Sequence, residues 1–296
     1  MRHRTIVTGS NGRLGRALAW VIEEEHGDEL ADTVFATRDE IDITDYFRLR
    51  SELERIEPTV IVNCAAYAQV DGCEQHPEAA ERVNAEGARF VARAAREVGA
   101  RVIHVSTDLV FDGRQEGAPA RRLYREDDPP NPLSVYAASK LAGEEAVAEE
   151  TDEHLILRSS WFFGPWPADR FPELFLKELS EGRSCRMVSD RLGSPTYLRD
   201  LARAVARLIL TPARGVLHFA NTGEPTSRYH VLAALAEMLG LPASRLVPLP
   251  DDLWTEDAAP RPAFSALDPS RYAELTGERP RPWRDTLAEY VAERSA

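Results

Sequence analysis

The chain has 296 residues, of which 49 are acidic and 36 are basic, and its formal net charge is −13. A surface this negative is not expected to bind nucleic acids or anionic membranes, because both partners are themselves anionic. No run approaches the ~20 apolar residues that a membrane span needs, and no apolar export segment follows the N-terminus. We therefore expect a soluble, cytoplasmic protein.

Short runs rich in β-branched residues alternate with longer helical patterns along the chain. The runs are almost continuously apolar, which is typical of a parallel sheet covered on both faces. Strand–helix alternation of this kind predicts an α/β fold with a doubly wound, Rossmann-type parallel sheet and right-handed crossovers. The candidate strands are 4–9, 32–37, 58–65, 100–107, 154–160, 184–190 and 215–220.

The character of the sequence changes near residue 160, where proline and aromatic residues become frequent and the elements irregular. We assign residues 1–160 to a nucleotide-binding domain. Residues 161–296 are assigned mainly to a smaller α/β substrate lobe, interleaved with late elements of the sheet.

The first candidate strand leads into VTGSNGRLG, with glycines in a G-x-x-G-x-x-G spacing before a helix. Glycines here permit a tight turn, a close approach of the backbone to a pyrophosphate, and close packing of helix on strand. The helix N-terminus offers free N–H groups to the anion. This context favours a dinucleotide site over a simple glycine turn. The expected cofactor-binding residues are Gly9, Ser10, Asn11, Gly12, Arg13, Leu14 and Gly15.

The second candidate strand ends in VFATRDEID. An acidic residue commonly binds the ribose 2′-hydroxyl of NAD at this place, whereas a nearby arginine accommodates the 2′-phosphate of NADP. Arg38 stands close to this position, although an ordinary surface arginine is an equally good interpretation. We favour NADPH and keep NADH as the alternative. Asp42 and Ile43 are expected to flank the adenine.

The segment SVYAASKLAGEEAVAEE contains Tyr136 and Lys140 four residues apart, and its composition predicts a helix after Pro132. Residues four apart share a helix face. The chain has 8 tyrosines and two lysines, so roughly 0.05 such pairs are expected by chance. The pair alone is still compatible with a solvated helix face.

Together, TGSNGRLG, NCAAY, STDLVFDG, SVYAASKLAGE, RSSW and GSPT resemble the extended short-chain dehydrogenase/reductases, in particular the dTDP-4-dehydrorhamnose reductase family. The resemblance implies that Tyr136 protonates the C-4 ketone oxygen of a nucleotide-sugar while the nicotinamide delivers hydride. Lys140 would bind the nicotinamide ribose and lower the pKa of Tyr136 by its charge. Thr107 would hydrogen-bond the same ketone oxygen.

The resemblance also assigns further binding residues. Cofactor contacts are expected at Cys64, Ala65, Ala66, Tyr67, Asn84 and Ser106, in addition to Tyr136 and Lys140. Substrate contacts are expected at Thr107, Asp108, Leu109, Trp161, Thr196 and Arg261. Thr107 and Asn84 have plain structural alternatives, as a strand end and a helix residue, and Phe163 is expected in the core of the lobe.

The sequence departs from the family pattern at several positions. Leu109 stands where the reductases have a tyrosine, and Ala-Gln-Val-Asp-Gly-Cys-Glu follows NCAAY where a threonine and a lysine are frequent, so the identity of the sugar stays open. Leu109 also replaces the glutamate base of the related 4,6-dehydratases, which favours ketone reduction over elimination.

Some family members bind magnesium between subunits through acidic residues. The corresponding positions here are Ala17 and Arg199, so we expect no such metal. The three cysteines lack a C-x-x-C pair and indicate no zinc site. A homodimer is compatible with the sequence. The functional alternatives are a ketoreductase for another deoxysugar and a non-catalytic NADP-binding subunit, resembling the β subunit of methionine adenosyltransferase.

Overall fold

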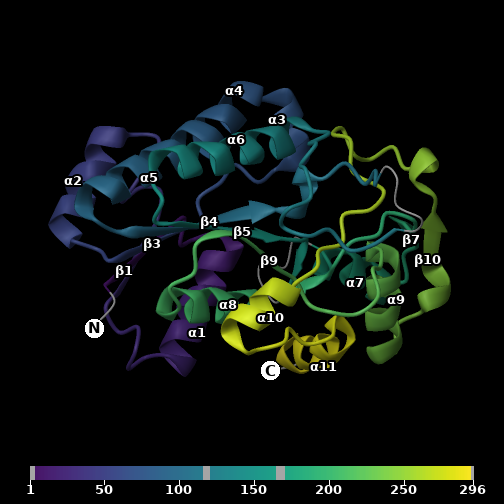
Figure 1. Ribbon diagram of the computed structural model, residues 1–296. Helices are drawn as coiled ribbons and strands as arrows, with labels where there is room; N and C mark the ends of the chain where they lie inside the picture. Colours follow the sequence, from purple (N-terminus) through teal and green to yellow (C-terminus); the bar gives the residue numbers. More distant parts are fainter. Residues whose placement is uncertain (1–3, 116–120, 165–170, 295–296) are drawn as a thin grey trace.

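The computed structural model describes residues 4–115, 121–164 and 171–294, and its centre is a sheet of six parallel strands (Figure 1). The strand order is β2-β1-β3-β4-β5-β9, so the order reverses direction beside β1. The predicted doubly wound α/β fold is confirmed. The strands are β1 (Thr5–Thr8), β2 (Thr33–Ala36), β3 (Val60–Asn63), β4 (Arg101–Thr107), β5 (His154–Ser159) and β9 (Gly215–Phe219).

Helices cover both faces of the sheet (Figure 1). On one face α1 (Arg13–Glu25) and α8 (Leu198–Leu210) pack together over a core of aliphatic side chains. On the other face α2 (Tyr46–Ile56), α5 (Gly87–Val98) and α6 (Val135–Glu150) lie side by side. Burial on both faces explains why the strands read as continuous apolar runs.

Short helical elements join β3 and β4 to these layers. Two short helices and a π-helical segment lead from β3 into α5, and a 3₁₀ turn follows β4 directly. They are α3 (Val70–Gln75), α4 (Pro77–Ala80), the π-helix Glu81–Glu86 and the 3₁₀ turn Asp108–Val110.

The C-terminal part forms a smaller α/β lobe beside the carboxyl end of the sheet. Two parallel strand pairs, β6 with β8 and β7 with β10, build it together with α7, α9 and α11. Their bounds are β6 (Phe162–Phe163), α7 (Glu173–Ser180), β7 (Cys185–Val188), β8 (Thr196–Tyr197), α9 (Arg228–Met238), β10 (Leu246–Leu249), α10 (Ser270–Thr276) and α11 (Trp283–Arg294), with 3₁₀ turns at Ala243–Arg245 and Asp251–Leu253.

The structure shows how the lobe and the sheet interleave. The predicted strand 184–190 forms β7 of the lobe, whereas the predicted strand 215–220 forms β9 of the central sheet. Phe163 is fully buried in the core of the lobe, as predicted. The domain boundary near residue 160 stays a prediction.

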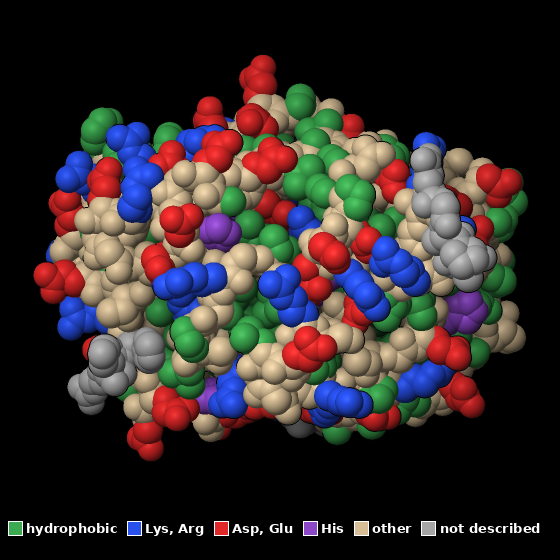
Figure 2. All heavy atoms as spheres, in the orientation of Figure 1, with side chains coloured by type: hydrophobic (Ala, Val, Ile, Leu, Met, Phe, Trp, Pro, Cys, Tyr) green, Lys and Arg blue, Asp and Glu red, His purple; other side chains and the backbone are tan. Residues whose placement is uncertain are grey.

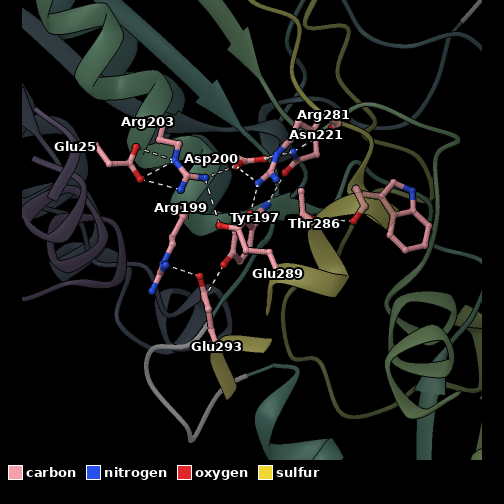
Figure 3. A network of polar contacts seen from close by, with 11 residues as sticks. Glu25, Tyr197, Arg199, Asp200, Arg203, Asn221, Arg281, Thr286, Glu289 and Glu293 are labelled. Atoms are coloured by element: carbon pink, nitrogen blue, oxygen red, sulfur yellow. Dashed lines mark hydrogen bonds and ion pairs between the residues drawn. The ribbon is translucent and has the colours of Figure 1, made fainter. Parts of the chain in front are cut away.

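A network of polar contacts links α11 of the lobe to α1 and α8 (Figure 3). Arg203 lies 2.8 Å from Glu25 on α1 and 3.4 Å from Glu289 on α11. Arg281 lies 2.5 Å from Asp200 on α8 and 2.8 Å from Glu289. Such a network specifies geometry more than it adds stability, because each charge is partly desolvated. It holds the lobe in place beside the sheet.

On the face shown in Figure 2, acidic and basic side chains are interspersed over the surface. Many arginines pair with acids on their own or a neighbouring helix, as Arg50 does with Glu54 and Arg89 with Glu149. None of the helices in residues 4–115, 121–164 and 171–294 has the length and apolarity needed to cross a bilayer.

Candidate active site

The parallel strands bring most of the predicted site residues to one edge of the sheet, where β1, β3, β4 and β5 end. Helix α6 brings Tyr136 and Lys140 to the same edge. The helix begins where the sequence predicted, because the Ser134 hydroxyl accepts from the Ala137 N–H at 3.2 Å. The Glu74 carboxylate accepts from the Val135 N–H at 2.8 Å and occupies another free donor of the first turn.

The glycine loop after β1 is sterically required. Gly9 has φ +67°, and a Cβ on it would lie 2.7 Å from the Ala65 backbone. A Cβ on Gly15 would lie 2.5 Å from Ser10 Cα. Gly12 caps α1 without a side chain, and the first turn of the helix carries no acidic residue, so this helix N-terminus suits an anion.

The side chains around this loop differ in accessibility. Leu14 packs in the core beneath the sheet, so its backbone is the part that faces the loop. Asn11 is exposed, and its carbonyl accepts from Arg16 Nε at 2.8 Å. Ser10 is buried, and its N–H donates to the Ala36 carbonyl at the end of β2. These contacts shape the loop as a pyrophosphate cradle would require.

The end of β2 carries an accessible cation. The Arg38 side chain is 66% exposed, and its Nε lies 3.3 Å from the Asp42 carboxylate. Asp42 also accepts from the N–H and the hydroxyl of Thr44, which fixes the turn. Ile43 packs in the core beside α5, since a Cβ on Gly87 would lie 2.8 Å from its Cδ1. Arg38 is therefore oriented by Asp42 and open to a ligand, while the Ile43 side chain faces inward.

Asn84 organises the segment after β3. It lies in the π-helix, a geometry frequent at functional sites, and is buried. Its side chain accepts from the Tyr67 N–H at 2.8 Å, and donates to the Tyr67 carbonyl at 3.2 Å and to the Ser139 hydroxyl at 2.9 Å. Asn84 thereby fixes the backbone at Tyr67 against α6, next to Lys140. These contacts give Asn84 a structural role beyond that of a plain helix residue, and a contact between Asn84 and the cofactor stays a prediction.

Cys64, Ala65 and Ala66 follow β3 and form the wall opposite the glycine loop. The Cys64 N–H donates to the Thr8 carbonyl, which continues the pairing of β3 with β1. Burial raises the pKa of the Cys64 thiol to about 12, so the thiol stays protonated at neutral pH. Small side chains here leave room for a cofactor to pass the backbone.

Asp108, directly after Thr107, is the most constrained acid of the site. Its buried carboxylate accepts from Ser160 Oγ at 2.8 Å, from Ser265 Oγ at 2.5 Å and from Thr107 Oγ1 at 3.3 Å. Burial raises the pKa of Asp108 to about 6, and the three hydroxyl donors act in the opposite direction. Asp108 thus joins the ends of β4 and β5 to the C-terminal lobe.

Tyr136 lies next to this acid. Burial raises the pKa of Tyr136, the negative charge of Asp108 raises it further, and a hydrogen bond with Thr107 lowers it. The sequence predicted that Lys140 would lower this pKa. In the structure the direction is upward, because burial outweighs the other contributions and the Lys140 amine is directed at other atoms. A phenol with a raised pKa holds its proton and can donate it.

Lys140 ends in a buried polar pocket behind Tyr136. Its Nζ donates to the Val105 carbonyl at 2.7 Å and lies 3.0 Å from His104 Nε2. Burial lowers the pKa of Lys140 to about 8, while the charge of Glu144 raises it. Ser106 contributes to this pocket indirectly, since its hydroxyl donates to Glu144 at 2.5 Å.

Trp161 stands on the lobe side of the site and is partly buried. Its ring packs edge-on against Phe171 at 5.6 Å, and the Arg228 guanidinium lies 5.7 Å from its centroid. A Cβ on Gly193 would lie 2.8 Å from Trp161 Nε1, so this glycine makes room for the ring.

Three other predicted substrate residues have structural partners. Arg261 lies 2.9 Å from the Asp71 carboxylate and donates to the Ala259 carbonyl, which ties the lobe to α3. Thr196 is fully buried, and its hydroxyl donates to the Ser194 carbonyl at 3.2 Å. Leu109 donates its N–H to Thr107 Oγ1 at 3.2 Å. Substrate contacts by these residues stay predictions.

Comparison with known proteins is consistent with this geometry. The RmlD substrate binding domain family model matches residues 3–296. The chain belongs to this family. Within it, dTDP-4-dehydrorhamnose reductase from Mycobacterium tuberculosis is 40% identical over 98% of this chain and 92% of its own length. The prediction of the family from the sequence motifs is confirmed.

Two further relatives bear on the site. dTDP-4-keto-6-deoxy-D-glucose reductase from Streptomyces niveus is 35% identical over 93% of both chains. The crystal structure of dTDP-4-dehydrorhamnose reductase from Bacillus anthracis in complex with NADP superposes with a TM-score of 0.90 at 32% identity, covering 99% of this chain and 100% of that one.

Ala17 and Arg199, the positions for which the sequence predicted no metal, have other contacts in the structure. The Arg199 guanidinium pairs with Glu293 and lies 3.7 Å from the centroid of the Trp20 ring, while Ala17 is buried in the core. Within residues 4–115, 121–164 and 171–294, no cluster of three or more His, Cys, Asp and Glu side chains is placed to hold a metal ion. That the chain binds no metal stays a prediction.

The sequence reasoning gave no role to Ser160, Ser265, His104 or Arg228. Ser160 and Ser265 lie within the family-like segments RSSW and RPAFS, so a signal for both was present in the sequence. Their common partner, Asp108, is 52 and 157 residues away, a pairing that needs the fold. His104 lies inside a strand and Arg228 at the start of a helix, where nothing local marks them.

Proposed function

We propose that this protein reduces the 4-keto group of dTDP-4-dehydro-L-rhamnose with NADPH and forms dTDP-L-rhamnose. The observation that carries the proposal is the position of Tyr136 beside Thr107, at the carboxyl edge of a sheet whose first turn is a glycine loop. Family membership, and a 40% identical relative of this activity, support the choice of substrate.

The chain's own residues suit each task of the cofactor site. The N-terminus of α1 and the close approach of Gly9 to Ala65 suit a pyrophosphate, and the exposed Arg38 suits a 2′-phosphate. The relative that carries NADP supports this choice of cofactor. When bound, NADPH supplies the hydride for the carbonyl carbon.

Tyr136 would give its proton to the ketone oxygen, and Thr107 would hydrogen-bond the same oxygen. The buried setting favours this transfer, because it keeps Tyr136 protonated until negative charge develops on the substrate. Lys140 would support Tyr136 from the buried pocket beside it. The overall balance is one hydride from NADPH and one proton from the medium for each ketone reduced.

On the lobe side, Trp161 and Arg228 would receive the nucleotide-sugar. Arg228 is exposed, and its guanidinium stacks 5.7 Å from the Trp161 centroid, so a cation and an aromatic face are presented together. A guanidinium suits the diphosphate and an aromatic ring suits a sugar face. Arg261 and Thr196 would contribute to substrate binding indirectly, by fixing the segments that they contact. A homodimer and a cytoplasmic location complete the proposal.

The experiment is reduction of enzymatically prepared dTDP-4-dehydro-L-rhamnose, followed by loss of the NADPH absorbance at its reduced-nicotinamide band and by isolation of the sugar product. Stoichiometric oxidation with dTDP-L-rhamnose as product is the expected result. Cofactor binding without oxidation would contradict the proposal and favour a binding subunit, a reading that the intact Tyr136 and Lys140 pair disfavours.

A second candidate keeps the chemistry and changes the sugar. Leu109 stands where the reductase pattern has a tyrosine, and the 35% identical Streptomyces niveus relative is named for dTDP-4-keto-6-deoxy-D-glucose. Comparing kcat/KM for the two ketosugars separates the candidates. A Leu109→Tyr variant should increase the preference for dTDP-4-dehydro-L-rhamnose if position 109 contacts the sugar.

A further inference from the structure

Lys140 shares its buried pocket with a histidine that has no role in the proposed reaction. Lys140 and His104 are 2% and 1% exposed, and Nζ lies 3.0 Å from His104 Nε2. The other ring nitrogen, Nδ1, lies 3.1 Å from Asn63 Nδ2 at the end of β3. Asn63 of β3, His104 of β4 and Lys140 of α6 thus form a continuous chain of polar contacts.

The backbone of Ala65 fixes the orientation of the Asn63 amide. The Ala65 N–H can only donate, and it lies 3.2 Å from Asn63 Oδ1, which must therefore be the oxygen. The Thr8 hydroxyl donates to the same oxygen at 2.8 Å. Asn63 Nδ2 consequently faces His104 as a donor, and His104 Nδ1 must accept.

This orientation determines where His104 carries its proton. Burial lowers the pKa of His104 well below its usual value, and a doubly protonated ring would turn an N–H toward the Asn63 donor, so the ring is neutral. A neutral imidazole has one N–H. Because Nδ1 accepts from Asn63, the proton is on Nε2 and points at Lys140 Nζ.

A lysine amine facing an N–H donor at 3.0 Å forms a hydrogen bond only if it offers a lone pair. An ammonium has no lone pair and would place hydrogen against hydrogen. The uncharged amine can accept from His104 and still donate to the Val105 carbonyl at 2.7 Å. The contact with His104 thus forms only with the uncharged amine and disfavours protonation of Lys140 in the pocket.

We propose that His104, held by Asn63 as the Nε2–H tautomer, is a positioning residue that disfavours protonation of Lys140 while its amine rests against Val105. Uptake of a proton by Lys140 is then coupled to departure of its side chain from this pocket. The catalytic meaning of this coupling rests on the proposed reductase function, in which a proton from the medium must reach Tyr136 after each turnover.

The other ionisable groups around Lys140 do not account for an uncharged amine. Glu144 on α6 raises the pKa of Lys140, and the Cys64 thiol after β3 is protonated at neutral pH. The Glu144 carboxylate is itself paired with Arg158 at 2.7 Å, which limits its effect on the amine. Burial is the largest contribution to the lowered pKa. The proposed His104 N–H would act in the same direction.

The composition of the chain makes a direct test practical. Lys140 and Lys177 are the only lysines in 296 residues, so protein made with ¹³Cε-labelled lysine gives two signals, which Lys177→Arg assigns. In cofactor-free protein the Lys140 signal should titrate near pH 8. The ¹⁵N shifts of the His104 ring should identify the Nε2–H tautomer.

Two variants should replace the N–H donor that faces Lys140 Nζ with a hydrogen-bond acceptor. In His104→Gln the amide oxygen can turn to the ammonium, and in Asn63→Asp the carboxylate accepts from Nδ1–H, so that Nε2 becomes an acceptor. Each should raise the Lys140 midpoint by about one pH unit or more. His104→Gln adds no charge, which separates the tautomer effect from that of the new carboxylate.

Thr8→Val is the matched control, because it removes one donor to Asn63 while the Ala65 N–H still fixes the amide. Its Lys140 midpoint should equal that of the wild type. The pH profile of kcat should move to higher pH in His104→Gln by the same shift as the NMR midpoint. A Nδ1–H tautomer in the wild-type protein would overturn the proposal, and so would identical midpoints in wild type and His104→Gln. Neither result depends on turnover, so the reductase function is tested separately.

Discussion

Asp108 accepts a 2.5 Å hydrogen bond from Ser265, and this contact joins the end of β4 to a segment of the lobe 157 residues later. The same carboxylate oxygen accepts from Ser160 at the end of β5. Because Asp108 follows Thr107 and lies near Tyr136, the contact also sets the distance between the lobe and Tyr136. The lobe and the chemistry are therefore positioned by one buried acid.

Because its pKa is raised, Asp108 should make the stability of the protein depend on pH. Its folded-state pKa of about 6 lies above the usual 3.8, so the unfolded chain loses this proton first as the pH rises. The folded state is penalised progressively between these values and fully above them, by roughly 3 kcal/mol. We expect Asp108→Asn to gain stability relative to wild type between pH 4 and pH 7, measured by urea unfolding. Parallel stability curves for the two proteins would contradict this.

Ser265→Ala is a second test of the contact between Ser265 and Asp108. It removes a donor that lowers the pKa of Asp108, so the pKa should rise further and the pH-dependent loss of stability should extend to higher pH. Ser180→Ala is a control, since that exposed hydroxyl donates to the Lys177 carbonyl on the far helix α7. If both serine variants show the same pH dependence, the Asp108 contact is not the cause.

Gly143 of α6 is required by its contact with Asn84. A Cβ at position 143 would lie 2.1 Å from the Asn84 carbonyl oxygen, in backbone that the π-helix holds in place. Glycine to alanine inside a helix ordinarily stabilises by about 1 kcal/mol. Here we expect Gly143→Ala to destabilise by about 3 kcal/mol, measured by chemical unfolding.

Gly27→Ala serves as the control for this steric argument. The nearest atom to a Cβ there is the Glu23 carbonyl oxygen at 3.4 Å, which is ordinary contact. Its stability should stay within about 0.5 kcal/mol of wild type. Equal stability of the two alanine variants would show that α6 and Asn84 can move apart without cost.

We propose that the preference for NADPH over NADH depends on Arg38. Loss of a charge-assisted contact with a 2′-phosphate is worth about 1.5–3 kcal/mol, or about 10–100-fold in affinity. We expect Arg38→Ala to weaken NADPH binding by this factor and to leave NADH binding nearly unchanged, by fluorescence titration. Arg55→Ala removes an arginine that pairs with Glu52 on α2, and should change neither affinity. Equal losses for both cofactors in Arg38→Ala would refute the assignment.

The local sequence predicted much of this fold, because the signals were local. Continuous apolar runs marked each strand of the sheet, and Ser134 with the following helix formers marked the start of α6. The two-residue strands β6 and β8 were missed, since a run that short has no periodicity to detect. β10 contains Pro248, a residue that argues against a strand.

The site was predicted to the extent that the family-like segments carried it. The strand ends, Tyr136 and Lys140 were found in this way. The partners of Asp108 and Lys140 were not found, because Ser265 and His104 are distant in sequence and gain meaning only when β4, α6 and the lobe are packed together. For the same reason the direction of the Tyr136 pKa was wrong. Burial, which dominates it, depends on the whole surrounding structure.

The central claim is that Tyr136 supplies the proton in reduction of a nucleotide-activated 4-ketosugar. The most direct test is a single-turnover measurement with saturating NADPH and dTDP-4-dehydro-L-rhamnose, comparing wild type with Tyr136→Phe. We predict that the variant binds NADPH with unchanged affinity and reduces the sugar about 10²–10⁴-fold more slowly. A variant that reduces the sugar at the wild-type rate would contradict the claim.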